Sequence, residues 1–247
     1  MTRLSVNLNK IALLRNARDS GLPSVTRAAT IALHAGAAGI TVHPRPDARH
    51  VRASDVRELA LLLERHPEAE FNIEGNPFHN LMPIALETRP HQCTLVPDDA
   101  DAVTSNSGWA LPARAHELEP LVARLHAAGV RVSLFMDPAP ETMRYAREIG
   151  ADRVELYTES FARAPANPAL LARYVESAHA ARVAGLAVNA GHDLNLQNVA
   201  QFVEAAGPIA EVSIGHALIG DALEMGLDSA VRAYVAAIAS GRRADTR

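Results

Sequence analysis

Short β-branched runs alternate with longer amphipathic stretches along the whole chain, and this repeat leaves few folds open to it. The longer stretches carry apolar residues three and four positions apart, which is the spacing of one helix face. Several end in glycine, as at Gly36, Gly129 and Gly150, where a helix C-terminus favours a residue that tolerates positive φ. The predicted strands are residues 4–8, 39–43, 70–74, 92–96, 130–136, 153–157, 186–190 and 211–215, and the clearest predicted helices are 24–36, 53–65, 117–129, 140–150 and 167–185.

Eight units of strand and helix, averaging about 30 residues, predict an α/β fold, a (β/α)8 TIM barrel with additional helices. The length of 247 residues suits such a barrel, which typically takes about 250 residues. An open doubly wound sheet is the alternative, but no GxGxxG motif follows the first predicted strand, which disfavours its dinucleotide-binding version. Because no linker interrupts the pattern, we expect a single domain over residues 1–240 and a flexible tail over 241–247.

The composition excludes several classes of protein. A net charge of −4 argues against a nucleic-acid backbone or an anionic membrane as the main partner. No apolar run approaches the roughly 18 residues that a membrane-spanning helix needs, and the N-terminal segment lacks the apolar core of a secretory signal. The single cysteine, Cys93, cannot form a disulfide within the chain, so we expect a cytoplasmic location.

Polar residues gather where the predicted strands end. In barrels of this type the reacting groups lie at the C-terminal ends of the strands and in the loops that follow. We therefore expect these side chains to share one pocket, although Glu74 can also be interpreted as an arginine partner and His192 as a helix cap. Asp137, before Pro138, is either the first residue of a helix or a ligand. The expected pocket residues at the strand ends are Asn7, Asn9, Lys10, His43, Arg45, His50, Glu74, Glu155, Tyr157, Asn189, His192 and His216.

Two segments suggest anion sites at this pocket. Gly215 and His216 lead from the last predicted strand into a helix, whose free backbone N–H groups bind phosphate. Arg45 and His50 form the second candidate site, since arginine can hold a phosphate through two parallel hydrogen bonds. Arg18 is placed to reach either site. Two anion sites at one barrel mouth imply two phosphorylated molecules, or one molecule with a phosphate at each end.

Two further features belong to the same pocket. Lys10 is the only lysine among 24 basic residues, which suggests a requirement for a compact ammonium group at that position. Residues 97–114 form a long polar loop that is either a lid over the pocket or simply mobile. As a lid, this loop would bring Thr104 and Ser105 to the substrate and exclude water from it.

Seven motifs span nearly the whole chain. They are VNLNKIALLRNAR (6–18), GITVHPRPDARH (39–50), FNIEGN (71–76), LVPDDADAVTSNSGW (95–109), VSLFMD (132–137), VNAGHDLN (188–195) and IGHALIG (214–220). Together and in this order, these motifs resemble those of the pyridoxine 5′-phosphate synthase family. The set is specific even though each motif alone is not.

The resemblance implies a (β/α)8 barrel that assembles as an octamer built from dimers and requires no cofactor or metal. It implies condensation of 3-amino-2-oxopropyl phosphate with 1-deoxy-D-xylulose 5-phosphate, which yields pyridoxine 5′-phosphate, phosphate and water in vitamin B6 biosynthesis. By the family's motifs, His43 and Glu74 are proton acceptors, His192 is a proton donor and Glu155 stabilises a transition state. The residues implied to bind the amino-ketone phosphate are Asn7, Arg18, Asp193, Gly215 and His216, and those implied to bind the pentulose phosphate are Arg45, His50 and Thr104.

The chain departs from the family pattern at Asn9 and Lys10, where many members carry Asp-His in contact with the pentulose phosphate. Asparagine keeps the hydrogen bonding without the charge, and lysine replaces a titratable imidazole by a fixed cation. A binding role therefore survives at both positions, while proton transfer at Lys10 is in doubt. At Asp193, where other members carry glycine, only the backbone role transfers.

Two other functions compete with the synthase. A divalent-metal sugar isomerase would use His43, Glu74, His192 and His216 as ligands, since mixed histidine and carboxylate sets suit zinc or manganese. A non-catalytic barrel that binds phosphosugars would hold both phosphates without turnover. The synthase is favoured because several acid–base groups with no cofactor motif suit a condensation built from proton transfers.

Overall fold

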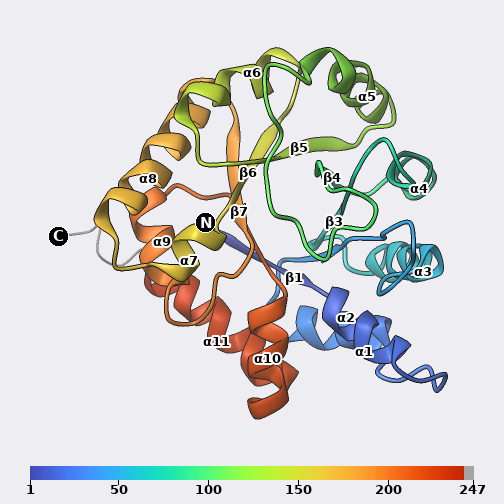
Figure 1. Cartoon of the computed structure of the whole chain (residues 1–247). Helices are drawn as coiled ribbons and strands as arrows, with labels where there is room; N and C mark the ends of the chain where they lie inside the picture. Colours follow the sequence, from blue (N-terminus) through green and yellow to red (C-terminus); the bar gives the residue numbers. More distant parts are fainter. Residues whose placement is uncertain (242–247) are drawn as a thin grey trace.

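The eight predicted strands form a closed parallel barrel in the order of the sequence, which confirms the (β/α)8 fold (Figure 1). The computed structural model describes residues 1–241. β1 pairs with β8 to close the barrel, with Leu4 opposite Val212 and Val6 opposite Ile214. Every predicted strand boundary lies within one residue of the observed one. The strands are β1 (Arg3–Asn7), β2 (Gly39–Val42), β3 (Glu70–Gly75), β4 (Gln92–Leu95), β5 (Arg131–Met136), β6 (Arg153–Tyr157), β7 (Ala187–Gly191) and β8 (Glu211–Ile214).

Helices surround the barrel and cover its apolar outer face (Figure 1). Their ends follow local chemistry: the Ser24 side chain caps α2 by accepting from the Arg27 N–H, and Asn167 caps α8 just before Pro168. The helices are α1 (Asn9–Asn16), α2 (Val25–His34), α3 (Ala53–Leu63), α4 (Leu81–Thr88), α5 (Ala115–Ala127), α6 (Met143–Glu148), α7 (Glu159–Arg163), α8 (Pro168–Val183), α9 (Val199–Ala206), α10 (His216–Met225) and α11 (Leu227–Ser240).

One predicted helix differs from the observed structure. The stretch 140–150 begins as a 3-10 turn, η1 (Pro140–Thr142), and only then becomes α6. Pro140 lacks a backbone N–H and has a fixed φ, which suits a tight first turn rather than a full α-helical start. Of the predicted tail 241–247, only Gly241 belongs to the described residues, and the rest of the tail lies outside them.

The interior of the barrel is polar, although branched apolar side chains usually fill such interiors. Ser5 and Thr41, from β1 and β2, share a hydrogen bond of 2.7 Å. Asn189 of β7 reaches Gln92 of β4 at 3.4 Å, and because these strands are not neighbours the bond spans the inside of the barrel. Leu4 and similar apolar residues point outward to the helices, so the sequence alternation places polar groups inside.

Charged residues close the N-terminal mouth of the barrel. Glu70 at the start of β3 pairs with Arg3 at 2.6 Å, with Arg131, and with Arg153 at 3.7 Å. This cluster lies at the strand end opposite to the one where the predicted site residues gather. Within residues 1–241, no helix combines the length and the apolar character that crossing a bilayer requires.

Candidate active site

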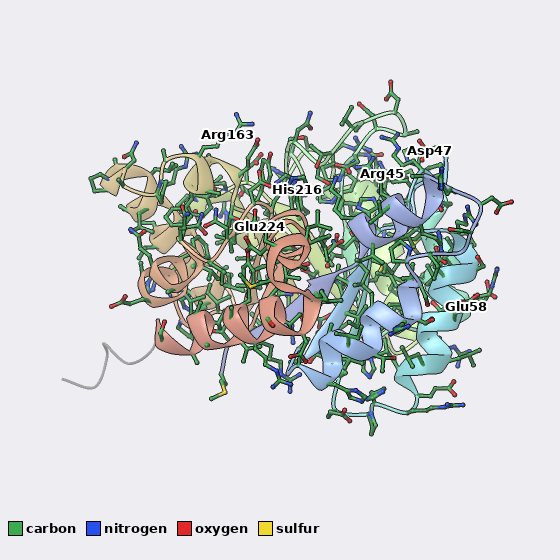
Figure 2. The ribbon with its side chains drawn as sticks, turned by 90° about the horizontal axis from the view of Figure 1, so that it is seen from below. Arg45, Asp47, Glu58, Arg163, His216 and Glu224 are labelled. Carbon is green, nitrogen blue, oxygen red and sulfur yellow. The ribbon has the colours of Figure 1, made fainter. Side chains whose placement is uncertain are left out.

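A cavity of about 440 Å³ opens at the C-terminal ends of the strands. Figure 2 shows Arg45, Arg163 and His216 at this same end of the molecule, whereas Glu58 lies away from it. The cavity is lined by Asn7, Asn9, Lys10, His43, Arg45, His50, Glu74, Val96, Val103, Thr104, Ser105, Phe135, Glu155, Glu159, Arg163, His192, Asp193, Ser213, Gly215 and His216.

The cavity brings together every predicted catalytic or binding residue except Arg18. Arg18 is exposed in the turn that follows α1, so its assignment to a substrate stays a prediction. Three strand-end candidates also lie off the cavity. Tyr157 packs behind His192, Asn189 lies inside the barrel, and Asp137 is exposed after β5.

His43 and Glu74 face each other from the ends of β2 and β3, with His43 Nδ1 4.0 Å from Glu74 Oε2. The His43 N–H donates to Asn9 Oδ1 at 2.9 Å, which fixes the backbone at the tip of β2. Burial, followed by the charge of Arg45, holds the pKa of His43 well below its usual value. Burial, followed by the nearby carboxylates, raises the pKa of Glu74 well above its usual value.

These opposite shifts set the protonation of the pair near neutral pH. His43 is neutral and able to accept a proton, while burial and the neighbouring carboxylates favour the protonated form of Glu74. A carboxylic acid beside a neutral imidazole can pass a proton in either direction, which is the property that acid–base chemistry needs.

Glu155 lies deeper in the barrel, on β6. Its Oε2 atom is buried without a hydrogen-bond partner, and its pKa rises to about 8, first because of burial and then because of the charge of Glu211. Gly191 of β7 makes room for this side chain, since a Cβ there would lie 2.2 Å from Glu155 Oε1. The glycine in the VNAGH motif is therefore a condition for placing Glu155 under the cavity.

His192 is held from several sides at the end of β7. Its Nε2 atom lies 3.0 Å from the Thr104 hydroxyl oxygen, and its carbonyl accepts a 2.6 Å hydrogen bond from the Thr158 hydroxyl. The imidazole packs edge-on against Tyr157, with ring centroids 5.0 Å apart. The φ angles of His192 and Asp193 are +84° and +64°, a left-handed turn that aims the imidazole toward the cavity.

A cationic group occupies the side of the cavity near β2. His50 Nδ1 accepts the Val51 N–H at 2.9 Å, which leaves Nε2–H as the donor of the neutral ring. Burial, then Arg45 and Lys10, lowers the pKa of His50 to about 4, so this imidazole stays neutral. The local positive charge therefore comes from Lys10 and Arg45, and it attracts an anion.

Arg45 has a partner that the sequence pattern does not reveal. Asp98, from the loop after β4, accepts from Arg45 Nη2 at 2.5 Å, and both side chains are buried. This pair leaves only part of the guanidinium for a substrate anion. The acidic PDD segment after β4 was a usable signal, but only the fold shows which arginine Asp98 meets.

The second anion site is the start of α10. Gly215 precedes its first residue, His216, and no side chain caps the helix there, so the first backbone N–H groups are free toward the cavity. Gly215 also packs against Asn7, where a Cβ would come within 3.0 Å of the Asn7 Cβ. Glu159 and Arg163 of α7 line the same side and were not anticipated, because the sequence does not reveal which helical residues reach the rim.

The loop of residues 97–114, here called the lid loop, covers part of the mouth (Figure 1, green). Thr104 and Ser105 line the cavity, and the Thr104–His192 contact joins the loops after β4 and β7. The return half is anchored to the barrel: the Trp109 N–H donates to Phe135 O, and Trp109 Nε1 donates to Leu95 O, each at 2.9 Å. The observed loop is thus arranged as a lid over the site. Among residues 1–241, no three His, Cys, Asp or Glu side chains are grouped as metal ligands.

The fold resembles solved barrels that differ widely in sequence. One is 3-hexulose-6-phosphate synthase from Salmonella typhimurium, with a TM-score of 0.65 and 13% identity, covering 98% of this chain and 100% of that chain. Another is thiamine phosphate pyrophosphorylase from Pyrococcus furiosus, with a TM-score of 0.62 and 13% identity, covering 98% of this chain and 96% of that one. At this identity the likeness concerns the fold alone.

Sequence comparison is much more specific. The chain is 57% identical to pyridoxine 5′-phosphate synthase of Albidiferax ferrireducens, over 98% of this chain and 99% of the relative. It is 50% identical to the Bacteroides thetaiotaomicron synthase, over 95% of this chain and 98% of that protein. The sequence model for pyridoxal phosphate biosynthesis protein PdxJ matches residues 4–240. The chain therefore belongs to the pyridoxal phosphate biosynthesis protein PdxJ family.

Proposed function

We propose that this chain is a pyridoxine 5′-phosphate synthase that condenses 3-amino-2-oxopropyl phosphate with 1-deoxy-D-xylulose 5-phosphate. The observation that carries the proposal is that His43, Glu74 and His192 line one cavity, which lies between the Lys10–Arg45 cations and the start of α10. Membership of the PdxJ family supports the same reaction. The products are pyridoxine 5′-phosphate, inorganic phosphate and water.

The protonation states of the site suit the bond-forming steps. Ring closure requires removal of protons from carbon and nitrogen, and neutral His43 is the available acceptor. Glu74 begins as the acid, and the ammonium group of the amino-ketone, on approaching it, lowers the Glu74 pKa and releases a carboxylate base. The base then appears only when substrate is bound.

His192 lies next to the start of α10 and next to the lid, where a leaving oxygen requires a proton. The Thr104 contact holds Nε2 at the mouth, so the imidazole is directed toward bound substrate. Glu155, protonated at neutral pH under the cavity, is placed to donate a hydrogen bond to charge that develops on an oxygen. These roles assign proton acceptance to the β2–β3 side and proton donation to the β7 side.

The unusual Asn9-Lys10 pair fits a binding role. Asn9 holds the His43 N–H through its side-chain oxygen, a contact that does not require a carboxylate. Lys10 lines the cavity close enough to His50 to lower its pKa, so its ammonium group belongs to the pentulose phosphate site. Arg45, His50 and Thr104 complete that site, while Asn7, Asp193, Gly215 and His216 surround the amino-ketone phosphate.

The test is incubation of the purified protein with both phosphorylated substrates, with pyridoxine absorbance and released phosphate as readouts. We expect Glu74→Gln to lower kcat by about 10²–10⁴-fold with an unchanged circular dichroism spectrum, because the amide cannot carry the proton. Glu58→Gln, at an exposed position on α3 far from the mouth, is the matched control and should leave kcat unchanged (Figure 2). Near-wild-type turnover by Glu74→Gln would remove Glu74 from the chemistry.

Loss of turnover on chelation, restored by zinc or manganese, would favour the metal isomerase class.

We also propose that the chain forms a homo-octamer, as the family resemblance implies. Leu13, Leu14 and Leu22, on α1 and the turn beyond it, expose 43%, 51% and 67% of their surface, which favours contact with another copy. Light scattering after gel filtration should give eight times the chain mass of 26.4 kDa, and a monomer peak would contradict the assembly.

A cytoplasmic location is proposed from the free, buried Cys93 and is tested by cell fractionation.

A further inference from the structure

The segment His43–His50, here called the phosphate arm, is a rigid part of the barrel mouth. Asn16 of α1 donates to the carbonyl oxygens of Ala48, Arg49 and His50 at 3.3, 3.1 and 2.8 Å. Arg15, itself paired with Asp55 of α3, adds a bond to His50 O at 3.2 Å. The arm is therefore fixed directly to α1, and through the Arg15–Asp55 pair to α3, before any substrate arrives.

Arg49 points from this arm to the lid loop and not into the cavity. Its Nη1 donates to Ala102 O at 3.0 Å and its Nη2 to Ala100 O at 3.3 Å. Asp47 aligns the Arg49 side chain, because its carboxylate accepts one hydrogen bond from the Arg49 backbone N–H at 3.1 Å and another from Arg49 Nε at 2.7 Å. With its donors directed in this way, Arg49 does not line the cavity.

A second connection joins the same two segments under the lid. Asp98 Oδ2 accepts from Arg45 of the arm at 2.5 Å and from Ser105 of the lid at 2.8 Å. Asn76, after β3, donates to Asp98 O at 2.8 Å and fixes the root of the loop. The lid is therefore held at its root by a buried ion pair and at its outer part by Arg49.

The geometry points to Arg49 as a positioning residue that latches the lid to the phosphate arm, so that Thr104 is held against His192. Val103 alone separates Ala102, whose carbonyl accepts from Arg49, from Thr104, which contacts His192. The Val103 side chain is 89% exposed. This short stretch has no apolar packing of its own to keep it in place. The latch thus joins the arm that binds one phosphate to the imidazole that serves the other substrate.

The latch rests on the proposed synthase function and makes a distinct kinetic prediction. Removing a residue that binds the phosphate directly raises KM. Removing a residue that holds the lid makes the closed site form less often and therefore lowers kcat. We expect Arg49→Met to lower kcat roughly tenfold while KM for the pentulose phosphate changes less than twofold. Arg49→Lys should be intermediate, because one ammonium group replaces two aligned donors.

The position of the lid can be measured without any turnover. Cys93 is buried, so Val103→Cys introduces the accessible thiol at which a nitroxide label reports lid mobility by electron paramagnetic resonance. In this background Arg49→Met should narrow the spectral lines, and Arg57→Met should not. Arg57 is a matched control because it also pairs with a carboxylate, that of Glu87, but on the exposed surface of α3.

The two measurements together decide the inference. A fall in kcat at constant KM, together with narrower lines, supports the latch. A raised KM with wild-type kcat, or an unchanged spectrum in Arg49→Met, overturns it. If the unmodified protein has no synthase activity, the proposed function fails, while the resonance spectrum still decides whether Arg49 holds the lid.

Discussion

At the scale of single residues, the charge around His50 shows how the site controls protonation. The His50 imidazole is kept neutral by burial and by the cations Arg45 and Lys10, and its Nδ1 atom is occupied by the Val51 N–H. An imidazole in this state donates through Nε2 without adding charge. The positive charge that attracts a phosphate is carried instead by the ammonium group of Lys10 and the guanidinium group of Arg45.

Removing the Lys10 charge should therefore change His50. We expect Lys10→Met to raise the pKa of His50 from about 4 toward its usual value, because the imidazolium no longer faces that cation. Titration of the imidazole signals by nuclear magnetic resonance measures this directly. The same variant should raise KM for the pentulose phosphate about tenfold or more, since a charge-assisted hydrogen bond contributes about 1.5–3 kcal/mol. A His50 pKa that stays near 4 would show that Lys10 lies too far away to act.

At the scale of elements, the return half of the lid loop depends on one glycine. A Cβ on Gly108 would lie 2.2 Å from the Asp137 backbone nitrogen and 2.5 Å from the Met136 carbonyl carbon. Backbone atoms at the end of β5 cannot rotate away as a side-chain tip can. Gly108 therefore allows the loop to run against β5 and to place Trp109 in its buried site.

Gly108→Ala should displace this half of the loop and destabilise the protein by about 1–3 kcal/mol, as overpacking typically does. For a chain of this size that corresponds to a fall in Tm of several degrees, measured by calorimetry. Gly220→Ala is the contrasting control, because no atom lies within 4 Å of the new Cβ in the middle of α10. There the gain in helix propensity should stabilise the chain by up to about 1 kcal/mol. Equal Tm values for the two variants would contradict the packing argument.

At the scale of the whole molecule, the polar barrel interior makes stability depend on pH. Glu211 of β8 is buried with its Oε1 atom unpaired, and its pKa rises to about 7, chiefly through burial. Because the folded state holds this proton more tightly than the unfolded chain, the free energy of unfolding falls as pH rises from about 4.5 to 7. Above pH 7 the loss stays constant, at about 3 kcal/mol for a shift of this size.

Glu211→Gln removes that titration. The stability of the variant relative to the wild type should rise between pH 5 and 7 and then level off, because a glutamine amide has no proton to lose. Urea unfolding midpoints at several pH values, at one protein concentration, measure the difference. A constant difference across this range would mean that Glu211 stays ionised in the folded barrel.

The order of strands and helices, and the end of the barrel where the site lies, follow from local sequence patterns alone. The alternation of strand and helix segments is a local pattern that can be read along the chain. Because the C-terminal ends of all strands meet at one mouth of a closed parallel barrel, His43, Glu74 and His192 could be predicted to lie together. The start of η1 at Pro140 was missed because a periodic pattern does not distinguish a 3-10 turn from the first turn of a helix.

The pairs of groups that meet across that mouth depend on the folded chain and cannot be predicted from local patterns. Three contacts join residues that lie far apart in the sequence. Their separations are 53 positions for Arg45–Asp98, 53 for Arg49–Ala102 and 88 for Thr104–His192. Contacts of this kind depend on loop paths that no local periodicity specifies. The opposite pKa shifts of His43 and Glu74 were likewise fixed by the fold, because burial and neighbouring charge are properties of the assembled barrel.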